Sequence, residues 1–402
     1  PALLHACKLG YEYISLKKTS HEIDPETNIF KDIFYESIKK INQNKTERDV
    51  INKYKSISIS LANDDLGKEF YEMLINQSDI KLIDFENIEQ NTFNVVTELT
   101  FKNGEDEFRP DITFLINGLP LIILEVKKPN NPEGILAERL RINKRFQNKK
   151  FKKFINIFQK LIFSNNMDYD ENMGMLQGAF YAASTFKNDV KLNFFREEDL
   201  NFKPKFQNLS DDIEDKILKD NNLFSIKHSP EYITNKSIFS PTNKILSSLV
   251  SKDRLMFFIQ FGIAYVKKKS NFEKHIMRYP QFFASQSIIK TLNSDIKKGI
   301  IWHTQGSGKT ALSYYATQFL SDYFNKKNIV TKFYFIVDRL DLQTQAQIEF
   351  SNRGLTVNIL DNKKSLLEDF KKTKSINNFR GKDEITVINI QKFAEDKNEI
   401  KH

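Results

Sequence analysis

The spacing of hydrophobic and polar residues predicts a mixture of helices and strands in the first half of the chain. Apolar residues recur at helical spacing in residues 30–42, 66–76 and 137–146. Runs rich in β-branched and aromatic residues predict strands at residues 91–101, 155–164 and 178–186. A strongly apolar stretch at residues 109–129, interrupted by Asn117-Gly118, predicts a β-hairpin with its turn at that dipeptide.

The second half has a different pattern. Residues 187–245 are polar and irregular and contain Pro204, Pro230 and Pro241, which marks a join between domains. One helix is predicted at residues 242–266, and helices and strands then alternate, as expected for a parallel sheet covered by helices. The strands predicted there are residues 299–304, 331–338, 355–360 and 384–390, and the helices are residues 309–324, 342–352 and 365–372.

A chain of 402 residues is long enough for two domains with separate cores. We expect the first domain at residues 1–240, with a core at about 20–190 and a linker at about 187–245, and the second at residues 246–402. The chain starts at Pro1 and stops after a predicted strand, so we expect it to be part of a longer protein. The predicted fold class is α/β.

Composition narrows the class of protein only slightly. The net charge of +9 is compatible with a polyanionic partner, and equally with a coding bias toward Lys and Asn. Cys7 is the only cysteine, which excludes an intrachain disulfide and a cysteine-based zinc site and favours an intracellular location. The apolar runs are shorter than the roughly 18 residues that a membrane helix needs. We therefore expect a soluble, cytoplasmic protein without a membrane partner.

The hairpin "RPDITFLINGLPLIILEVKKP" carries charged residues at the ends of its apolar strands. With a loop centred on Gly118, antiparallel pairing places Asp111 directly across from Glu125, where two like charges destabilise the sheet unless a cation lies between them. Lys127 lies two residues after Glu125 and therefore on the same face. Two carboxylates plus solvent suit Mg²⁺, and a neighbouring lysine can orient or deprotonate a metal-bound water that attacks a phosphodiester. The alternative is a solvated strand end with a surface ion pair.

This stretch resembles the nuclease motif in the restriction subunit of type I restriction enzymes, a member of the PD-(D/E)xK nuclease superfamily. "CKLGYEYI" near the start and "NTFNVVTELTF" before the hairpin agree with that resemblance. The resemblance implies a restriction-endonuclease-like domain with a mixed sheet. It also implies that Asp111 and Glu125 bind Mg²⁺ and that Lys127 assists the attacking water.

The resemblance has one departure in the helix that follows. The family often has Gln four residues before an aromatic residue there, whereas this chain has Ile142 four residues before Phe146, so no role is assigned to that position. The basic run from Arg139 to Lys153 could contact a phosphate backbone, and a solvated helix face explains it equally well.

"GIIWHTQGSGKT" has the predicted context of a phosphate-binding loop: an apolar strand, a Gly-containing loop and then a helix. His303 stands where the strict pattern GxxxxGK[ST] has glycine. Lys309 would reach the β- and γ-phosphates of ATP, and Thr310 would bind Mg²⁺. The alternative is a Gly-rich turn that binds nothing. The residues expected to bind the nucleotide are Thr304, Gly306, Ser307, Gly308, Lys309 and Thr310.

"MRYPQFFA", "IWHTQGSGKT", "FIVDRLDLQTQ" and "VINIQKF" occur in the order found in the type I restriction motor, a superfamily 2 translocase, and resemble its motifs. The resemblance implies a RecA-like domain in which Gln281 reads adenine and Arg278 and Tyr279 shape the base pocket. A buried polar Gln is the alternative for Gln281. Arg339 would lie near the DNA-contacting edge, with a structural salt bridge as its alternative.

The acidic DEAH box of such motors is absent from these 402 residues, so the second domain is predicted to be incomplete, to bind ATP and to hydrolyse it poorly. The resemblance implies the R subunit of a type I site-specific deoxyribonuclease, which cuts unmethylated double-stranded DNA with Mg²⁺ and ATP while it translocates the DNA. Its partners would be methyltransferase (M) and specificity (S) subunits. Two alternatives stay open: a single-chain ATP-dependent restriction nuclease, and an ATP-regulated DNA-binding protein with an inactive nuclease fold.

Overall fold

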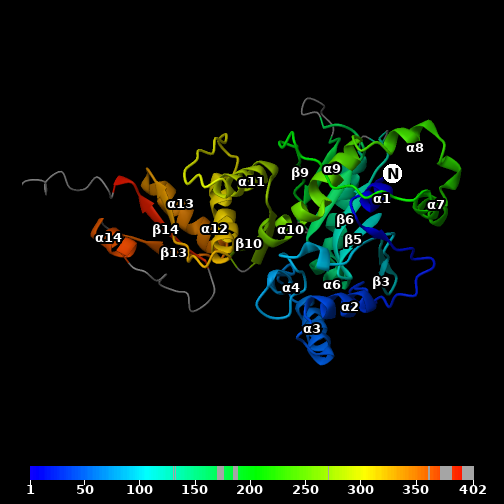
Figure 1. Cartoon of the computed structure of the whole chain (residues 1–402), viewed down its shortest axis with the longest axis horizontal. Helices are drawn as coiled ribbons and strands as arrows, with labels where there is room; N and C mark the ends of the chain where they lie inside the picture. Colours follow the sequence, from blue (N-terminus) through cyan, green and yellow to red (C-terminus); the bar gives the residue numbers. More distant parts are fainter. Residues whose placement is uncertain are drawn as a thin grey trace, which may run out of the picture. The chain divides into compact units, whose positions relative to one another are not determined.

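The computed structural model describes residues 1–129, 131, 133–169, 176–183, 189–269, 271–360, 363–371 and 383–391. The chain divides into two compact units (Figure 1). Unit 1 contains Pro1–Ile263 and Glu273–Ile276, and unit 2 contains Ala264–Phe272 and the chain from Met277 onward. Unit 1 therefore ends later in the chain than residue 240, where the sequence suggests a domain boundary.

A seven-stranded mixed sheet forms the centre of unit 1, with the order β1-β2-β5-β6-β7-β8-β9. The pairs β1–β2 and β6–β7 are parallel and the other pairs are antiparallel. The central strand β6 is buried along almost its whole length, because both of its neighbours pair with it. The strands are β1 (Glu12–Tyr13), β2 (Phe93–Thr97), β5 (Ile112–Ile116), β6 (Leu119–Val126), β7 (Lys160–Ser164), β8 (Ala179–Ala182) and β9 (Asn193–Phe194), and a separate pair is β3 (Phe101–Asn103) with β4 (Asp106–Phe108).

The predicted hairpin is β5–β6, and its turn is the two-residue Asn117-Gly118. Both residues have positive φ, 52° and 77°, as the tight turn requires. A Cβ atom on Gly118 would lie 2.6 Å from the Phe30 carbonyl oxygen, so only glycine fits. The hairpin prediction is confirmed.

The register of the hairpin changes along its length. Next to the turn Ile116 pairs with Leu119, and the register shifts by one residue at Phe114/Leu115. Beyond this bulge Ile112 pairs with Leu124, which is the register predicted for a loop centred on Gly118. The prediction of a loop centred on Gly118 is therefore wrong, because the turn is the two-residue Asn117-Gly118. The predicted register at the charged end of the hairpin is confirmed.

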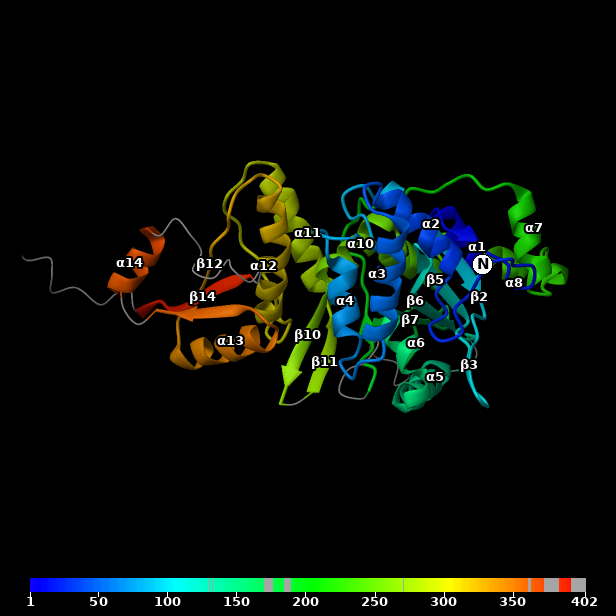
Figure 2. The same ribbon diagram turned by 90° about the horizontal axis from the view of Figure 1, so that it is seen from below.

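Helices surround the sheet, and the predicted helices at 30–42, 66–76 and 137–146 are confirmed as α2, α4 and α5. The helices α2, α3 and α4 pack against one another in sequence (Figure 2). The helices of unit 1 are α1 (Ala2–Lys8), α2 (Lys31–Ile41), α3 (Glu47–Ser60), α4 (Lys68–Ile75), α5 (Gly134–Gln147), α6 (Lys152–Ile157), α7 (Asp211–Asp220), α8 (Pro230–Asn235), α9 (Pro241–Val250) and α10 (Lys252–Phe261), with 3-10 turns η1 (Ile88–Gln90), η2 (Lys149–Phe151) and η3 (Phe224–Ile226).

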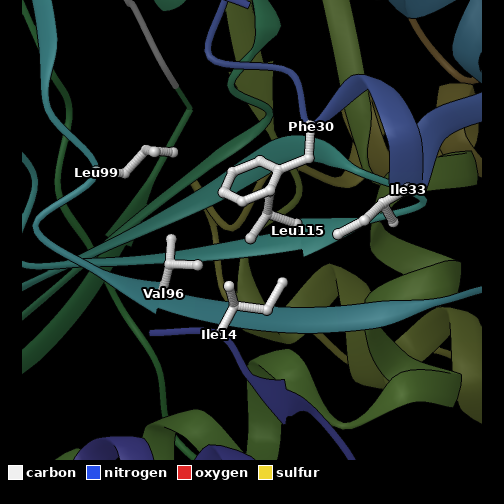
Figure 3. Packing of buried hydrophobic residues seen from close by; sticks show 6 residues of the cluster. All are labelled: Ile14, Phe30, Ile33, Val96, Leu99 and Leu115. Atoms are coloured by element: carbon white, nitrogen blue, oxygen red, sulfur yellow. The ribbon is translucent and has the colours of Figure 1, made fainter. Parts of the chain in front are cut away.

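One core cluster joins helix α2 to the sheet. Phe30 and Ile33, at the start of α2, pack with apolar residues of the strands and adjoining loops (Figure 3). Burial of this apolar surface stabilises the contact between helix and sheet at about 25 cal/mol per Å². The cluster consists of Ile14, Phe30, Ile33, Val96, Leu99 and Leu115.

Four element predictions for segments that begin in unit 1 were wrong in part. Residues 91–101 do not form one strand, because Glu98 has a φ of 52° after β2 ends. The first half of residues 155–164 lies in helix α6, which belongs to the crossover that β6 and β7 need in order to run parallel. Residues 242–266 form α9, α10 and the start of a strand, because Ser251 leaves helical geometry and Gly262 ends α10. The strand predicted at 178–186 ends at Ala182, and residues 184–186 lie outside the described residues.

Unit 2 contains a three-stranded sheet in the order β12-β14-β13, and both pairs are parallel. Helix α13 packs against this sheet (Figure 2). The predicted alternation and parallel sheet are confirmed for these strands. The elements are α11 (Tyr279–Asn293), α12 (Lys309–Asn325), β12 (Phe333–Val337), α13 (Leu340–Asn352), β13 (Thr356–Ile359), α14 (Lys363–Lys371) and β14 (Glu384–Asn389), while the boundary between the units runs through β10 (Ile263–Lys268) and β11 (Asn271–Ile276).

The strand predicted at residues 299–304 is wrong. These residues have no regular secondary structure and no strand partner among the described residues, and Ile300 and Trp302 are each 91% exposed. An apolar run becomes a strand only where a neighbouring strand pairs its backbone, and no described strand pairs with these residues. Across the described ranges, no helix combines the length and apolar character that crossing a membrane requires.

Candidate functional site

Asp111 lies one residue before β5 and is held by the backbone on both sides. Its Oδ2 accepts a hydrogen bond of 2.8 Å from the Val126 N–H, and its carbonyl oxygen accepts one of 3.1 Å from the Glu98 N–H. The side chain keeps 37% of its surface exposed. The carboxylate is therefore fixed against the end of β6 and still reaches solvent.

Glu125 is the buried carboxylate of the site, one residue before the end of β6, and it is only 3% exposed. Burial, followed by the negative charges of Asp111 and Glu138, raises its pKa to about 9, although Lys127 opposes the shift. Its Oε1 is buried without a hydrogen-bond partner among the described residues. A buried oxygen without a donor favours a cation beside it.

Lys127 follows β6 and points back to both carboxylates. Its N–H donates to the Ser164 carbonyl oxygen at 2.8 Å, which holds this segment beside β7. Its Nζ lies 3.5 Å from Asp111 Oδ2 and 3.7 Å from Glu125 Oε2. Burial lowers the pKa of Lys127, but the surrounding carboxylates outweigh burial and the net shift is upward. The three residues predicted from the motif are brought together, and the lysine is charged at neutral pH.

Glu138, on helix α5, was not among the residues predicted from the sequence, and its Oε2 lies 3.0 Å from Lys127 Nζ. Glu138 is fully buried, as are Ile135 and Ile142 on the same face of α5. The spacing of these three residues identifies a core-facing stripe, so the charged member of that stripe was a signal in the sequence. Ile142, where the family often has Gln, contributes only apolar packing here.

The arrangement fits a divalent cation bound by two carboxylates and water. Mg²⁺ commonly takes one or two carboxylates from a protein and keeps several waters. Asp111 is exposed to solvent, and Glu125 has a buried oxygen that no donor in the described ranges reaches. In the part of the chain that the structure describes, no group of three or more His, Cys, Asp or Glu side chains could hold a metal ion. Any metal here would therefore depend on the two carboxylates of the hairpin and on solvent.

The basic run after Arg139 is largely occupied by ion pairs within unit 1. Lys150 lies 2.6 Å from Asp106, and Arg139 contacts Asp189. Lysines 152 and 153 pair with acids in the same way. These pairs favour a structural role for several of the cations, and contact of the run with a phosphate backbone stays a prediction.

The phosphate-loop residues lie in unit 2, immediately before helix α12. Gly306 and Gly308 have φ values of 76° and 86°, which L-residues with side chains rarely adopt. Lys309 begins α12, and its Nζ donates to the carbonyl oxygens of His303 at 3.1 Å and Thr304 at 3.2 Å. Thr310 follows in the first helical turn and is partly buried. The loop thus places a lysine and a helix N-terminus where a phosphate could bind.

Gln281 and Arg278 hold this loop from the start of helix α11. Gln281 Nε2 donates to the Gly308 carbonyl oxygen at 3.0 Å, and its Oε1 accepts from the Arg278 N–H at 2.9 Å. Arg278 Nη2 donates to the Gly306 carbonyl oxygen at 3.0 Å. A Cβ at position 308 would lie 2.5 Å from Gln281 Nε2. Gln281 is 3% exposed and its amide is engaged with the loop, so adenine recognition by Gln281 stays a prediction.

Arg339, predicted to lie near a DNA-contacting edge, precedes helix α13. Its Nε lies 3.7 Å from Asp341 Oδ1, and both side chains are well exposed. An exposed pair of this kind contributes little to stability.

Unit 1 contains the carboxylate-lysine hairpin, which is β5–β6 with Asp111, Glu125 and Lys127, and this arrangement is typical of a nuclease. Unit 2 contains the candidate phosphate loop before α12, which is typical of an ATPase. Residues 1–170 match the family model described as type I restriction enzyme R protein N terminus, and residues 280–402 match the model described as SWI2/SNF2 ATPase. The resemblance predicted from the sequence is therefore confirmed: residues 1–170 are similar to the N terminus of type I restriction enzyme R proteins, and residues 280–402 are similar to SWI2/SNF2 ATPases.

The curated relatives of this chain are named as endonuclease subunits of type I restriction enzymes. A relative from Methanocaldococcus jannaschii, provisionally named type I restriction enzyme MjaVIIIP endonuclease subunit, is 28% identical over 80% of this chain and 28% of its own length. A second protein of that organism, provisionally named the MjaIXP endonuclease subunit, is 29% identical over 86% of this chain and 33% of its length. The type I restriction enzyme SsaAORF53P endonuclease subunit of Staphylococcus saprophyticus is 26% identical over 65% of this chain and 22% of its own length. The chain thus spans about a third or less of these relatives.

Proposed function

We propose that this chain belongs to the R subunit of a type I restriction enzyme, which cuts unmethylated double-stranded DNA and moves along it with ATP. The observation that carries the proposal is the convergence of Asp111, Glu125 and Lys127 at one end of the β5–β6 hairpin. In this proposal unit 1 has a PD-(D/E)xK fold, unit 2 has a RecA-like fold, and the functional domains correspond to residues 1–240 and 246–402. The relatives named as endonuclease subunits support the assignment.

Asp111 and Glu125 would hold a Mg²⁺ ion at the hairpin. When bound, Mg²⁺ acidifies a water and neutralises charge on a phosphodiester. The Asp111 and Glu125 carboxylates lie 3.5 and 3.7 Å from the same Lys127 ammonium, and the Val126 N–H holds Asp111 in place. Glu125 must lose its proton before it can act as a ligand, since burial keeps its pKa high.

Lys127 acts as a charged hydrogen-bond donor in this proposal. Its raised pKa opposes deprotonation at neutral pH, which makes it a weak general base. An ammonium beside the reacting phosphate stabilises the negative charge that develops on the oxygen atoms during hydrolysis. Of the two roles considered from the sequence, orientation of the attacking water is therefore favoured over its deprotonation, and charge stabilisation is added as a further role.

In unit 2, the proposed nucleotide is ATP with its own Mg²⁺. The Lys309 ammonium would exchange the carbonyl oxygens of His303 and Thr304 for phosphate oxygens, and backbone N–H groups from Thr304 to Lys309 would turn to the phosphates. Thr310 would bind the nucleotide's Mg²⁺. Gln281 is proposed to recognise adenine, which requires it to release Gly308.

The proposed partners are double-stranded DNA and methyltransferase (M) and specificity (S) subunits, and the proposed location is the cytoplasm. The relatives' names, as subunits of restriction enzymes, support this assembly.

The test is cleavage of unmethylated circular DNA by the full R subunit with its M and S partners, Mg²⁺ and ATP. Lys127→Ala is expected to reduce cleavage at least about 100-fold while ATP hydrolysis continues, because only the nuclease centre loses its ammonium. Lys309→Ala is expected to stop both. Lys128→Ala, which removes the exposed neighbouring lysine, is the control. Wild-type cleavage by Lys127→Ala would refute the nuclease assignment of the hairpin.

A further inference from the structure

Glu138 is a buried carboxylate that the proposed reaction does not use directly. It lies on α5, and its side chain is only 1% exposed. Removing a carboxylate from water is unfavourable unless cations and hydrogen bonds compensate for the lost solvation. The cations that pair with Glu138 are therefore needed to compensate for the cost of burying its charge, and their positions indicate its structural role.

Three cations compensate the Glu138 charge, and one of them comes from outside the helix. Arg141, one turn along α5, contacts Glu138 Oε2, and Arg145 Nη1 lies 4.0 Å from Oε1. The Arg145 guanidinium also lies over the Phe108 ring at 4.6 Å. The third cation is Lys127, on the segment that follows β6. Glu138 thus ties helix α5 to the lysine of the hairpin.

Among the three carboxylates around Lys127, Glu138 is the nearest. Lys127 Nζ lies 3.0 Å from Glu138, compared with 3.5 Å from Asp111 and 3.7 Å from Glu125. An ammonium and a divalent cation compete for the same carboxylate oxygens. Glu138 therefore competes with Asp111 and Glu125 for the ammonium and has the shortest of the three contacts.

We propose that Glu138 is a positioning residue, which holds the Lys127 ammonium closest to α5, weakens its pairing with Asp111 and Glu125, and so allows those two carboxylates to bind a divalent cation. The proposal rests on the proposed function of the hairpin. Because the described residues contain no set of three or more acidic, His or Cys side chains suited to a metal ion, Glu138 acts through Lys127 and is not a further ligand.

The first experiment measures binding of Mn²⁺ to the full chain by calorimetry without nucleotide. Glu138→Gln is expected to raise the dissociation constant about tenfold, because the ammonium then pairs with Asp111 and Glu125. Glu133→Gln, at the exposed start of the same helix, is the matched control and is expected to stay within about twofold. An unchanged dissociation constant in Glu138→Gln overturns the proposal.

A double-mutant cycle separates positioning from a general loss of negative charge. In a Lys127→Met background, Glu138→Gln is expected to change the Mn²⁺ dissociation constant less than about twofold, because no ammonium is left to move. A tenfold change in that background as well would show that Glu138 acts by its own charge, and the proposal would be wrong. If Glu138→Gln does not fold, Glu138→Asp is used in its place, because it keeps the charge but shortens the side chain. Its Mn²⁺ dissociation constant is measured in the wild-type and the Lys127→Met background, and the same fold-changes decide the outcome.

The outcomes also separate this inference from the proposed function. A wild-type chain that binds no Mn²⁺ would remove the metal site, and the nuclease proposal with it. A wild-type protein that binds Mn²⁺ and cuts DNA, while Glu138→Gln binds Mn²⁺ equally well, would remove only the positioning role.

Discussion

Two lysines of unit 1, Lys160 and Lys274, have side chains that are buried away from water. Lys160 on β7 is almost fully buried, with its Nζ donating to the Leu249 carbonyl oxygen at 2.9 Å and lying over the Phe258 ring at 4.3 Å. Burial lowers the pKa of Lys160 to about 7. Lys274, which donates to the Phe158 carbonyl oxygen, has its pKa lowered to about 7 in the same way. A carbonyl oxygen replaces only part of the lost hydration of an ammonium, so each lysine costs stability whenever it is charged.

This burial predicts a specific pH dependence of stability. Since the Lys160 pKa is about 7 in the folded protein and near 10.5 when unfolded, the penalty is complete below pH 7 and disappears as pH rises to 10.5. Lys160→Met removes this penalty, so the gain in unfolding free energy over wild type should be larger at pH 7 than at pH 10, by on the order of 3 kcal/mol. Urea unfolding at several pH values measures it.

The control for this prediction is an exposed lysine. Lys55→Met on α3 leaves the core unchanged and should show no such difference between pH 7 and pH 10. Loss of the Leu249 hydrogen bond shifts the stability of Lys160→Met equally at every pH, so a pH-independent difference would contradict the lowered pKa.

At the scale of elements, the β5–β6 hairpin positions the candidate nuclease site. The turn at Asn117-Gly118 and the bulge at Phe114/Leu115 together set the register at the far end, where Asp111 and Glu125 meet. A one-residue slip of a strand moves its side chains to the other face of the sheet. The turn therefore affects the site although it lies at the opposite end of the strands.

Gly118→Ala is expected to destabilise unit 1 by about 3 kcal/mol or more. The new Cβ would lie 2.6 Å from the Phe30 carbonyl oxygen and 2.9 Å from the Phe34 nitrogen, in addition to the strain of a positive φ. Thermal unfolding followed by circular dichroism measures the loss.

Gly104→Ala is the matched control for the turn. Gly104 also has a positive φ, 68°, but its Cβ would meet only the end of the Lys150 side chain, at 4.0 Å. Only the backbone strain remains, which costs about 1 kcal/mol. Equal losses in the two variants would mean that the close approach to α2 does not matter.

For the whole molecule, the two units carry different candidate chemistry. The carboxylate-lysine hairpin lies entirely in unit 1, and the phosphate loop with Gln281 and Arg278 lies entirely in unit 2. Each unit has its own sheet and its own buried residues. A ligand that binds one folded unit stabilises that unit by mass action.

We expect calorimetry of the full chain to show that ATP with Mg²⁺ stabilises unit 2. At a concentration 100 times the dissociation constant, the stabilisation is about 2.7 kcal/mol. Lys309→Ala should abolish the shift because it removes the ammonium that is proposed to contact the phosphates, while Lys127→Ala should keep it. A full shift in Lys309→Ala would contradict the assignment of the phosphate loop.

The sequence by itself determined those features that depend on neighbours in the chain. The hairpin follows from Asn117-Gly118 between apolar strands, and the closeness of Asp111, Glu125 and Lys127 follows from the pairing of those strands. The positive φ of Gly306 and Gly308 and the helix that begins at Lys309 likewise follow from the local sequence of the candidate phosphate loop. Turn chemistry and side-chain periodicity act over a few residues, so they can be recognised from the sequence.

Only the tertiary structure decided which distant groups meet. Glu138 reaches Lys127 because the crossover between β6 and β7 lays α5 against the site, and Gln281 reaches Gly308 because α11 packs beside α12. The apolar residues 299–304 have the pattern of a strand, yet among the described residues no neighbour pairs with them. Pairing and burial depend on the packing of elements far apart in the chain, and local hydrophobic spacing does not specify that packing.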